Sequence, residues 1–190
     1  AFGGNIIATI VNTWKDPQMV TVRPGVMKLA EPDPSRKGAI VKVKEQVDPA
    51  LKILNVIERV QKEKSVNLQA SQIIVAGGYG VGGKENFKLI YDLAKTLGGD
   101  VGSSRAAVDA GWIGHDHQVG QTGVTVRPKL YIACGISGSI QHRAGMTESG
   151  TIIAINKDPD APIFSAAHYG IVGEINSVLP KIIKAYKAKA

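Results

Sequence analysis

The segment LYIACGISG at residues 130–138 decides the fold class of this chain. Its first five residues form an apolar run that is typical of a strand buried on both faces, and the glycines and serine after it are typical of a turn into a helix. Two similar runs, IIVAGG at residues 73–78 and TIIAIN at residues 151–156, stand before and after it. Such strands predict a parallel sheet, because a strand covered on both faces shows no polar alternation.

Helical patterns separate these apolar runs. Between residues 87 and 97, apolar side chains recur on one helical face until Gly98-Gly99 ends the pattern. A short helix is expected to begin near Gly138, and a final helix carries an apolar stripe from Ile175 to Tyr186, with a kink expected at Pro180. The alternation predicts an α/β domain with a doubly wound parallel sheet, whose ligand would lie at the carboxyl ends of the strands.

The first third of the chain follows a different pattern. Runs rich in β-branched residues at 6–11, 19–22 and 41–44 predict strands, and residues 31–38 predict a polar loop. The apolar residues between 51 and 60 fit either a helix or a strand. The polar stretch at 61–72 predicts a boundary between a strand-rich remnant of a first domain, residues 1–65, and a second domain, residues 66–190. The chain opens without Met and enters an apolar segment at once, so we interpret it as starting inside a domain.

Composition narrows the class of protein. Hydrophobic residues make up 44% of the 190 residues and charged residues 21%, which is typical of a globular protein. No stretch approaches the ~20 apolar residues of a membrane-spanning helix. The single cysteine, Cys134, excludes an internal disulfide, indicates a reducing compartment and is expected in the core. The net charge of +7 comes from dispersed lysines with few aromatic residues, which argues against nucleic-acid binding.

Three glycine-rich segments are candidate ligand sites. Gly78–Gly83 has the G-x-G-x-x-G spacing of a dinucleotide-binding loop, with Asp100 near the position of a ribose-binding acid, but a plain tight turn explains it equally well. The same segment has most of the P-loop pattern, but Glu85 stands where a P-loop needs Ser or Thr to bind magnesium, which excludes a P-loop. Residues 137–142 follow the central strand and suit an anion at a helix start, unless Ser137 is an ordinary N-cap. The polar loop at 119–123 suits either the edge of a planar ligand or a surface turn.

Metal-dependent and hydrolytic chemistry have little support in the residues. His115-Asp116-His117 resembles part of a metal site, but adjacent side chains rarely point at one ion and no third ligand is apparent. We therefore favour a solvated loop there. No Ser/His/Asp set or pair of carboxylates indicates hydrolysis.

Four blocks taken together resemble the α subunit of electron transfer flavoproteins. They are SRAAVDAG at 104–111, QVGQTG at 118–123, LYIACGISGSIQH at 130–142 and INKDPDAPI at 155–163. Residues 1–60 resemble the end of that subunit's first domain more loosely. The resemblance implies that the chain corresponds to the carboxy-terminal part of the subunit and includes its FAD-binding domain.

The resemblance also implies which residues contact the flavin. By position they are Ser104, Arg105, Val119, Gly120, Gln121, Thr122, Ser137, Gly138, Ser139, Ile140, Gln141, His142, Asn156, Glu174 and Ile175. Arg105 and His142 would lie near the isoalloxazine ring, Thr122 would face its N5 edge, and Asn156 and Glu174 would serve the adenosine end. Without the neighbouring blocks, Arg105 would be interpreted as half of a surface ion pair. A donor such as His142 beside the flavin N1–C2=O edge would favour the anionic reduced flavin by ~1.5–3 kcal/mol.

Three positions depart from the family's pattern. Tyr79 stands where many members have a flavin-contacting Arg, which affects the contact with the pyrophosphate. Glu174 replaces a common Asp, and His168 replaces an Asp before Tyr169-Gly170.

The function that the resemblance implies is electron transport through FAD. The chain would pair with a β subunit in a heterodimer and accept electrons from dehydrogenases, such as the acyl-CoA dehydrogenases of fatty acid β-oxidation. It would pass them to a downstream oxidoreductase in the cytoplasm. One alternative is an NAD-binding dehydrogenase domain that uses Gly78–Gly83, and another is a scaffold subunit without a cofactor.

Overall fold

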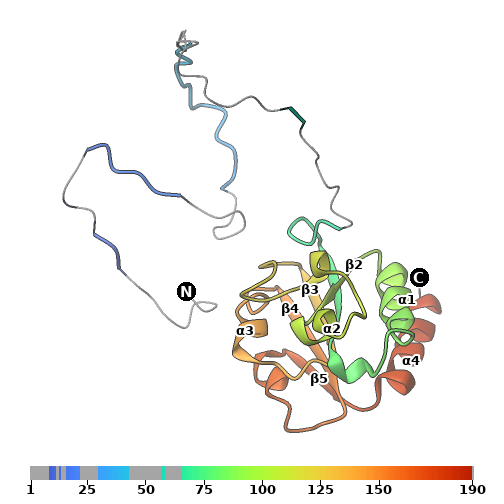
Figure 1. Cartoon of the computed structure of the whole chain (residues 1–190). Coiled ribbons are helices and arrows are strands. Elements are labelled where there is room, and N and C mark those ends of the chain that lie inside the picture. Colours follow the sequence, from blue (N-terminus) through green and yellow to red (C-terminus); the bar gives the residue numbers. More distant parts are fainter. Residues whose placement is uncertain are drawn as a thin grey trace.

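The computed structural model describes residues 9–11, 13, 16–21, 30–42, 57–58 and 66–189. Within these ranges, every helix and strand lies between Ile73 and Lys187. The fold that positions the candidate site is therefore built by residues 73–187 (Figure 1).

Five parallel strands form the sheet in the order β2-β1-β3-β4-β5. They are β1 (Ile73–Gly77), β2 (Asp100–Ser103), β3 (Leu130–Cys134), β4 (Thr151–Asn156) and β5 (Tyr169–Val172). From β1 the chain crosses to one side to form β2 and then returns past β1 to form β3. This reversal leaves a crevice beyond the carboxyl ends of β1 and β3, where doubly wound sheets bind their ligands. The predicted α/β fold with a doubly wound parallel sheet is confirmed.

The two faces of the sheet have different covers. Helices α1 (Phe87–Leu97) and α4 (Ile175–Lys187) lie side by side on one face (Figure 1). The other face is covered mostly by loops and short helical segments. The short segments of the domain are η3 (Tyr79–Val81), α2 (Arg105–Asp109), η4 (His115–His117), α3 (Ile140–Arg143) and η5 (Pro162–Ala166).

Alternating side chains on each strand divide the core into two clusters. On β3, Tyr131 and Ala133 belong to the cluster under the loops, whereas Ile132 and Cys134 belong to the cluster under α1 and α4. Both sets are apolar because both faces of a central parallel strand are buried. Cys134 is fully buried, and burial raises the pKa of its thiol to about 12. The prediction that Cys134 is a core residue is therefore confirmed.

The apolar runs locate the central strands well and the edge strands poorly. The predicted strands at 130–134 and 151–156 have the bounds of β3 and β4. The apolar residues 73–76 were predicted as the first strand, and β1 extends one residue further, to Gly77. Helix α1 begins and ends where its apolar face predicts, and Gly98 is its C-cap in the left-handed conformation. Helix α4 continues through Pro180 as one element. Strands β2 and β5 were not predicted.

The strands predicted before residue 66 are wrong wherever the structure describes them. Residues 9–11, 19–21 and 41–42 are not in strands, and their large apolar side chains, such as Ile10 at 90% exposure, contact no core. A strand needs a paired neighbour and a covered face, and the described part of this region offers neither. The rest of these predicted strands, and nearly all of the apolar stretch at 51–60, lie outside the described residues.

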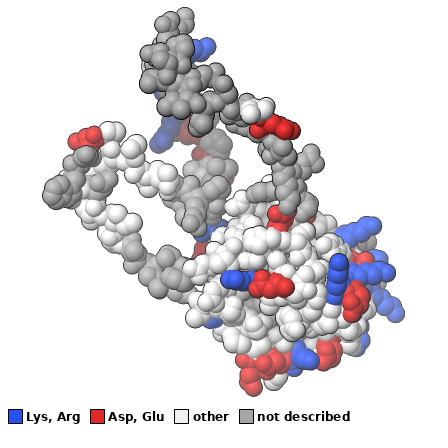
Figure 2. All heavy atoms as spheres, viewed as in Figure 1, with Lys and Arg blue, Asp and Glu red and all other residues white. Residues whose placement is uncertain are grey.

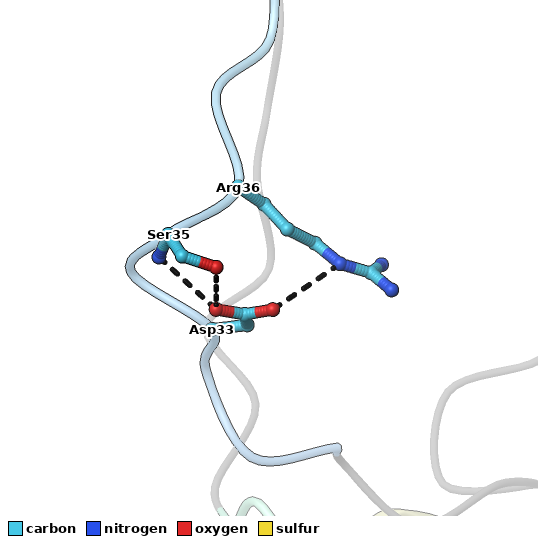
Figure 3. A network of polar contacts seen from close by, with 3 residues as sticks. All are labelled: Asp33, Ser35 and Arg36. Carbon is cyan, nitrogen blue, oxygen red and sulfur yellow. Dashed lines mark hydrogen bonds and ion pairs between the residues drawn. The ribbon is translucent and has the colours of Figure 1, made fainter.

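The predicted polar loop at 31–38 is confirmed, and it contains a small hydrogen-bonded turn (Figure 3). Asp33 Oδ1 accepts hydrogen bonds from the Ser35 hydroxyl at 2.6 Å and the Ser35 backbone N–H at 3.0 Å. Arg36 Nε lies 3.5 Å from the other carboxylate oxygen. The two bonds from Ser35 lower the pKa of Asp33, because they stabilise its charged form.

Positive charge is concentrated over the helical face. Figure 2 shows lysine and arginine side chains gathered at the side of the molecule where α1 and α4 lie. Lys184 and Lys187 belong to the last turn of α4, where cations are favourable beside the free carbonyl groups of the helix end. No helix in the described ranges combines the length and the apolar character that a membrane crossing requires.

Candidate functional site

A cavity of about 560 Å³ opens at the carboxyl ends of β1, β2, β3 and β4. Its walls are the segments that follow these strands, together with the loop at 118–122. This volume lies within the range of ~300–1,000 Å³ that is typical of small-molecule and cofactor sites. The position agrees with the prediction from the doubly wound fold, and most of the predicted site residues line the cavity.

The segment after β3 contributes Ser137, Ser139, Gln141 and His142 to the cavity wall. Gly138 has φ = +88° and turns the chain between the two serines, so that Ser139 becomes the N-cap of α3. Its hydroxyl accepts the His142 backbone N–H at 3.4 Å. The alternative that placed the N-cap at Ser137 is therefore wrong. Gly138 and Ile140 were predicted site residues, but they are not part of the lining.

The polar loop predicted at 119–123, together with Gln118 before it, packs against the segment after β3. The Gln121 backbone N–H donates to the Gln141 carbonyl at 2.8 Å, and the Val119 N–H donates to the Ser103 carbonyl at 2.9 Å. The four predicted residues of this loop, Val119 to Thr122, all line the cavity, and so does Gln118. The loop is thus a wall of the cavity and not a free surface turn.

Gln118 orients a hydroxyl in that wall. Its side chain is 3% exposed, and its Nε2 donates a hydrogen bond of 2.9 Å to Thr122 Oγ1. Because the Thr122 oxygen accepts this bond, its own O–H remains available as a donor to another group. Gln118 was not predicted as a site residue, although its place beside the polar loop was a usable signal.

The segment after β2 contributes Ser104 and Arg105. Ser104 precedes α2 but makes no side-chain cap, and its buried Oγ has no hydrogen-bond partner among the described residues. Arg105 Nε lies 3.4 Å from Asp109 Oδ2, and both side chains are well exposed. Arg105 therefore forms the surface ion pair of the simpler interpretation and also lines the cavity. An exposed pair of this kind contributes little to stability and leaves the guanidinium free to face an anion.

Asn156 holds two walls of the cavity together. Its Nδ2 donates to the Ile136 carbonyl at 3.0 Å, and its Oδ1 accepts the Asp158 backbone N–H at 3.0 Å. Two further predicted site residues lie outside the lining. Glu174 pairs with Lys157 at 3.9 Å on the surface, and Ile175 is 5% exposed within the core under α1 and α4.

His142 is the most buried polar side chain in the cavity wall after Gln118, at 5% exposure. Its Nε2 lies 3.0 Å from the Tyr131 hydroxyl, whereas its buried Nδ1 makes no hydrogen bond to the part of the chain that the structure describes. Burial lowers the pKa of His142 to about 4. The Val119 backbone beside the ring opposes part of this shift. His142 is therefore neutral at pH 7.

The glycine-rich segment after β1 passes close to the backbone that follows β3, and its residues Tyr79 and Gly80 line the cavity. Gly78 N–H donates to the Cys134 carbonyl and Gly80 N–H to the Gly135 carbonyl, at 2.8 and 2.9 Å. A Cβ on Gly78 would lie 2.2 Å from the Gly135 oxygen. The glycines thus allow two backbones to touch, which explains their spacing without a nucleotide.

The position of Asp100 contradicts the ribose-binding role predicted for it. It is the first residue of β2 and pairs in register with Ile74, at the amino end of the sheet. Its carboxylate accepts a hydrogen bond from the Ser71 hydroxyl there. A ribose-binding acid must stand at the carboxyl end, beside the glycine-rich turn. Asp100 lies at the wrong end of its strand for that role.

Tyr79, the position that departs from the family's Arg, lies at the rim of the cavity. Its ring is 63% exposed and stacks on Trp112, with centroids 5.0 Å apart and planes 14° from parallel. Phe87 contacts the same indole edge-on at 6.2 Å. Tyr79 therefore adds an aromatic face to the rim where a positive charge was expected.

Residues 115–117 form the short segment η4, which is not part of the cavity lining. His117 Nδ1 lies 2.6 Å from the Val101 carbonyl and donates to it. Among the described residues, no group of three or more His, Cys, Asp or Glu side chains is placed to hold a metal ion.

The polar atoms left in the cavity wall fit a bound polar cofactor. Among the described residues, four buried side-chain atoms make no hydrogen bond: Ser103 Oγ, Ser104 Oγ, His142 Nδ1 and Arg143 Nε. Two of them, Ser104 Oγ and His142 Nδ1, belong to residues that line the cavity. Such atoms are rare in folded proteins because each unmade hydrogen bond destabilises the fold. A ligand with polar groups along a planar ring system would provide the missing partners.

Comparison with known proteins gives two family matches. Residues 67–147 match the electron transfer flavoprotein FAD-binding domain, and residues 1–48 match the electron transfer flavoprotein domain. The first match contains the segments after β1, β2 and β3 that form most of the cavity wall.

Curated relatives resemble the chain along almost its whole length. It is 58% identical, over 98% of its residues, to "Electron transfer flavoprotein subunit alpha" of Thermoanaerobacterium thermosaccharolyticum, and covers 57% of that protein. It is 54% identical to "Protein FixB" of Clostridium saccharobutylicum, over 98% of this chain and 56% of the other. It is 46% identical to "Acryloyl-CoA reductase electron transfer subunit beta" of Anaerotignum propionicum, over 98% and 53%. The chain thus spans a little over half the length of the relatives it matches.

Proposed function

Because the chain belongs to the α-subunit family of electron transfer flavoproteins, we propose that it is the FAD-binding subunit of an electron carrier. Its cofactor is FAD, the ligand of the domain that matches residues 67–147. The observation that carries the proposal is the cavity at the carboxyl ends of the strands, where His142 Nδ1 and Ser104 Oγ have no hydrogen-bond partner among the described residues.

Different residues of the cavity wall would make different interactions with the cofactor. His142 offers a neutral N–H donor, and the Thr122 hydroxyl, oriented by Gln118, offers a second one. Arg105 supplies positive charge at the exposed rim. Because His142 is neutral, Arg105 would supply the positive charge that favours an anionic ring, and His142 would act through its hydrogen bond.

Bound FAD supplies the redox chemistry, since it accepts and releases electrons and the side chains of the wall do not. The chain's contribution is to position the ring, exclude water from one edge and set the local field. Of the predicted contacts, Gly138, Ile140, Glu174 and Ile175 lie outside the cavity lining, so we assign binding to the remaining set. Asn156 supports the wall, because both ends of its amide already bond to backbone groups.

We propose a β subunit as partner in a heterodimer, by analogy with the family. Dehydrogenases, such as the acyl-CoA dehydrogenases of fatty acid β-oxidation, would donate electrons, and a downstream oxidoreductase would accept them. One relative is named as an electron transfer subunit of an acryloyl-CoA reductase, which supports a redox partner that acts on CoA thioesters. We propose the cytoplasm as the location, in keeping with the single cysteine.

Titration of the purified chain with FAD, with and without a β subunit, tests the proposal. We expect flavin absorbance bands to remain with the protein after gel filtration. NAD-dependent turnover by a colourless protein would instead support the dehydrogenase alternative. A colourless protein without FAD affinity, in both conditions, would support the scaffold alternative.

Replacement of His142 tests the role of the buried imidazole. We expect His142→Ala to leave the fold intact and to lower the flavin midpoint potential, because the reduced anionic ring loses a hydrogen bond worth ~1.5–3 kcal/mol. Redox titration of the FAD-loaded protein measures the change. An unchanged potential would reject the role of His142 but not FAD binding.

A further inference from the structure

A buried tyrosine hydroxyl lies behind His142. Tyr131 belongs to β3 and is fully buried, and its hydroxyl oxygen lies 3.0 Å from His142 Nε2. The two rings are tilted by 56° with centroids 6.2 Å apart, so the contact is through the hydroxyl and not by stacking. The family resemblance assigned a role to His142 and none to Tyr131.

The hydrogens available on the two side chains show which of them donates the hydrogen bond between Tyr131 and His142. The tyrosine O–H needs an acceptor, and within the described residues the structure gives it Nε2 alone. If Nε2 carried the ring proton and donated to the tyrosine oxygen, the O–H would be left among apolar neighbours of the core without an acceptor. Unmade hydrogen bonds of buried groups are costly. The arrangement that satisfies both groups has Tyr131 donating to an unprotonated Nε2.

The protonation states of the two groups agree with this arrangement. Burial raises the pKa of Tyr131 well above its ordinary value, so the hydroxyl keeps its proton. Burial lowers the pKa of His142 to about 4, so the ring carries one proton at pH 7. With Nε2 occupied as an acceptor, that proton is on Nδ1, which makes no hydrogen bond to the described residues.

We propose that Tyr131 is a positioning residue that fixes the ring proton of His142 on Nδ1 and thereby makes His142 a hydrogen-bond donor to an electron-rich ring in the cavity. This inference rests on the proposed function for the identity of that ring. The tautomer itself is a property of the protein without cofactor. The two parts can therefore be tested separately.

The tautomer is tested first, in the full chain without FAD. In the ¹⁵N NMR spectrum of the histidine-labelled protein at pH 7, we expect His142 to show a protonated Nδ1 and an unprotonated Nε2. The spectrum of His142→Gln identifies its signals among those of the four histidines. In Tyr131→Phe we expect the preference for Nδ1–H to fall by about tenfold or more, since a buried acceptor loses its donor.

Tyr186→Phe is the matched control. Tyr186 lies on α4 with its side chain 45% exposed, so this variant removes a tyrosine hydroxyl away from His142. It should leave the signals of His142 unchanged. A wild-type spectrum with the proton on Nε2 would overturn the proposal without any variant, and so would a Tyr131→Phe spectrum identical to wild type.

The link to the cofactor is tested second, with FAD-loaded protein. We expect Tyr131→Phe to bind FAD but to have a more negative midpoint potential than wild type and Tyr186→Phe, in the same direction as His142→Ala. Unchanged potential in Tyr131→Phe would overturn the link. If none of the proteins binds FAD, the proposed function fails, while the NMR result still decides the tautomer.

Discussion

His142 shows how one side chain can be polar, buried and functional at once. The residue is 5% exposed, with one ring nitrogen hydrogen-bonded to Tyr131 and the other without a partner among the described residues. A neutral imidazole tolerates this environment, whereas an imidazolium would be poorly solvated there. The fold therefore stabilises the neutral form of His142, which predominates in the unfolded chain only above the ordinary pKa of histidine.

This difference predicts acid sensitivity of the cofactor-free protein. The pKa of His142 is about 4 in the fold and 6.5 ordinarily, so the unfolded chain takes up a proton first as the pH falls. The free energy of unfolding should therefore decrease between pH 6.5 and 4, by up to about 3 kcal/mol relative to a variant without the group. Urea unfolding of wild type and His142→Gln from pH 7 to pH 4 measures this difference. If the free energy of unfolding changes with pH in the same way in both proteins, His142 does not contribute to the acid sensitivity.

Sequence reasoning grouped residues that line one cavity, but it did not identify their hydrogen-bond partners. Arg105, Thr122 and His142 were placed in one site by the family blocks, and the structure brings all three to one cavity. The role of Asn156 in joining two walls could not be predicted, because its acceptor, the Ile136 carbonyl, belongs to a distant segment. Tyr131 carried a signal that was not used: a hydroxyl within an apolar strand needs a buried partner.

At the scale of elements, the turn at Gly138 positions the segment between β3 and α3. Its φ is +88°, and a Cβ there would lie 2.3 Å from the backbone nitrogen of Ile163. Two separate penalties therefore act against a side chain at this position, the left-handed backbone and the contact with a rigid neighbour.

Alanine replacements separate these two penalties. Gly111 also has positive φ, at +72°, but a Cβ there meets nothing within 4 Å. We expect Gly111→Ala to cost about 1 kcal/mol, from backbone strain alone. Gly138→Ala should cost roughly 2–5 kcal/mol, because overpacking adds to the strain. Urea unfolding of both variants measures the difference. Equal losses in the free energy of unfolding would show that the backbone around Gly138 moves to accommodate the methyl group at no further cost.

The elements that sequence patterns missed are those with weak apolar signals. Strand β2 is four residues long, begins with Asp100 and contains Gly102, so it lacks the run that identified β3. Strand β5 is at the edge of the sheet, and all four of its residues are exposed. The glycine spacing at 78–83 was ambiguous for a different reason, since its partner, Gly135, is remote in sequence.

At the scale of the whole molecule, the site and its core belong to one part of the chain. Both core clusters, with the partly buried residues packed on them, lie between Val66 and Ile183, and the cavity wall lies between Tyr79 and Pro162. The match to the FAD-binding domain begins at residue 67. These ranges favour the proposed boundary between residues 1–65 and 66–190.

A shortened chain tests that boundary. We expect residues 66–190 to unfold in one cooperative transition and to bind FAD with the affinity of the full chain, because the described contacts of the cavity lie inside this range. Calorimetric titration with FAD compares the two proteins. A loss of affinity in the shortened chain would show that residues 1–65 contribute to the site.

The close approach of Gly78 and Gly80 to Gly135 also limits how this cavity could be transplanted or diversified. A loop graft that carries residues 135–142 into another scaffold must bring residues 77–81 with it, because the two backbones touch where a side chain would otherwise stand. In a saturation-mutagenesis library, these three positions should therefore retain glycine even when selection acts only on folding.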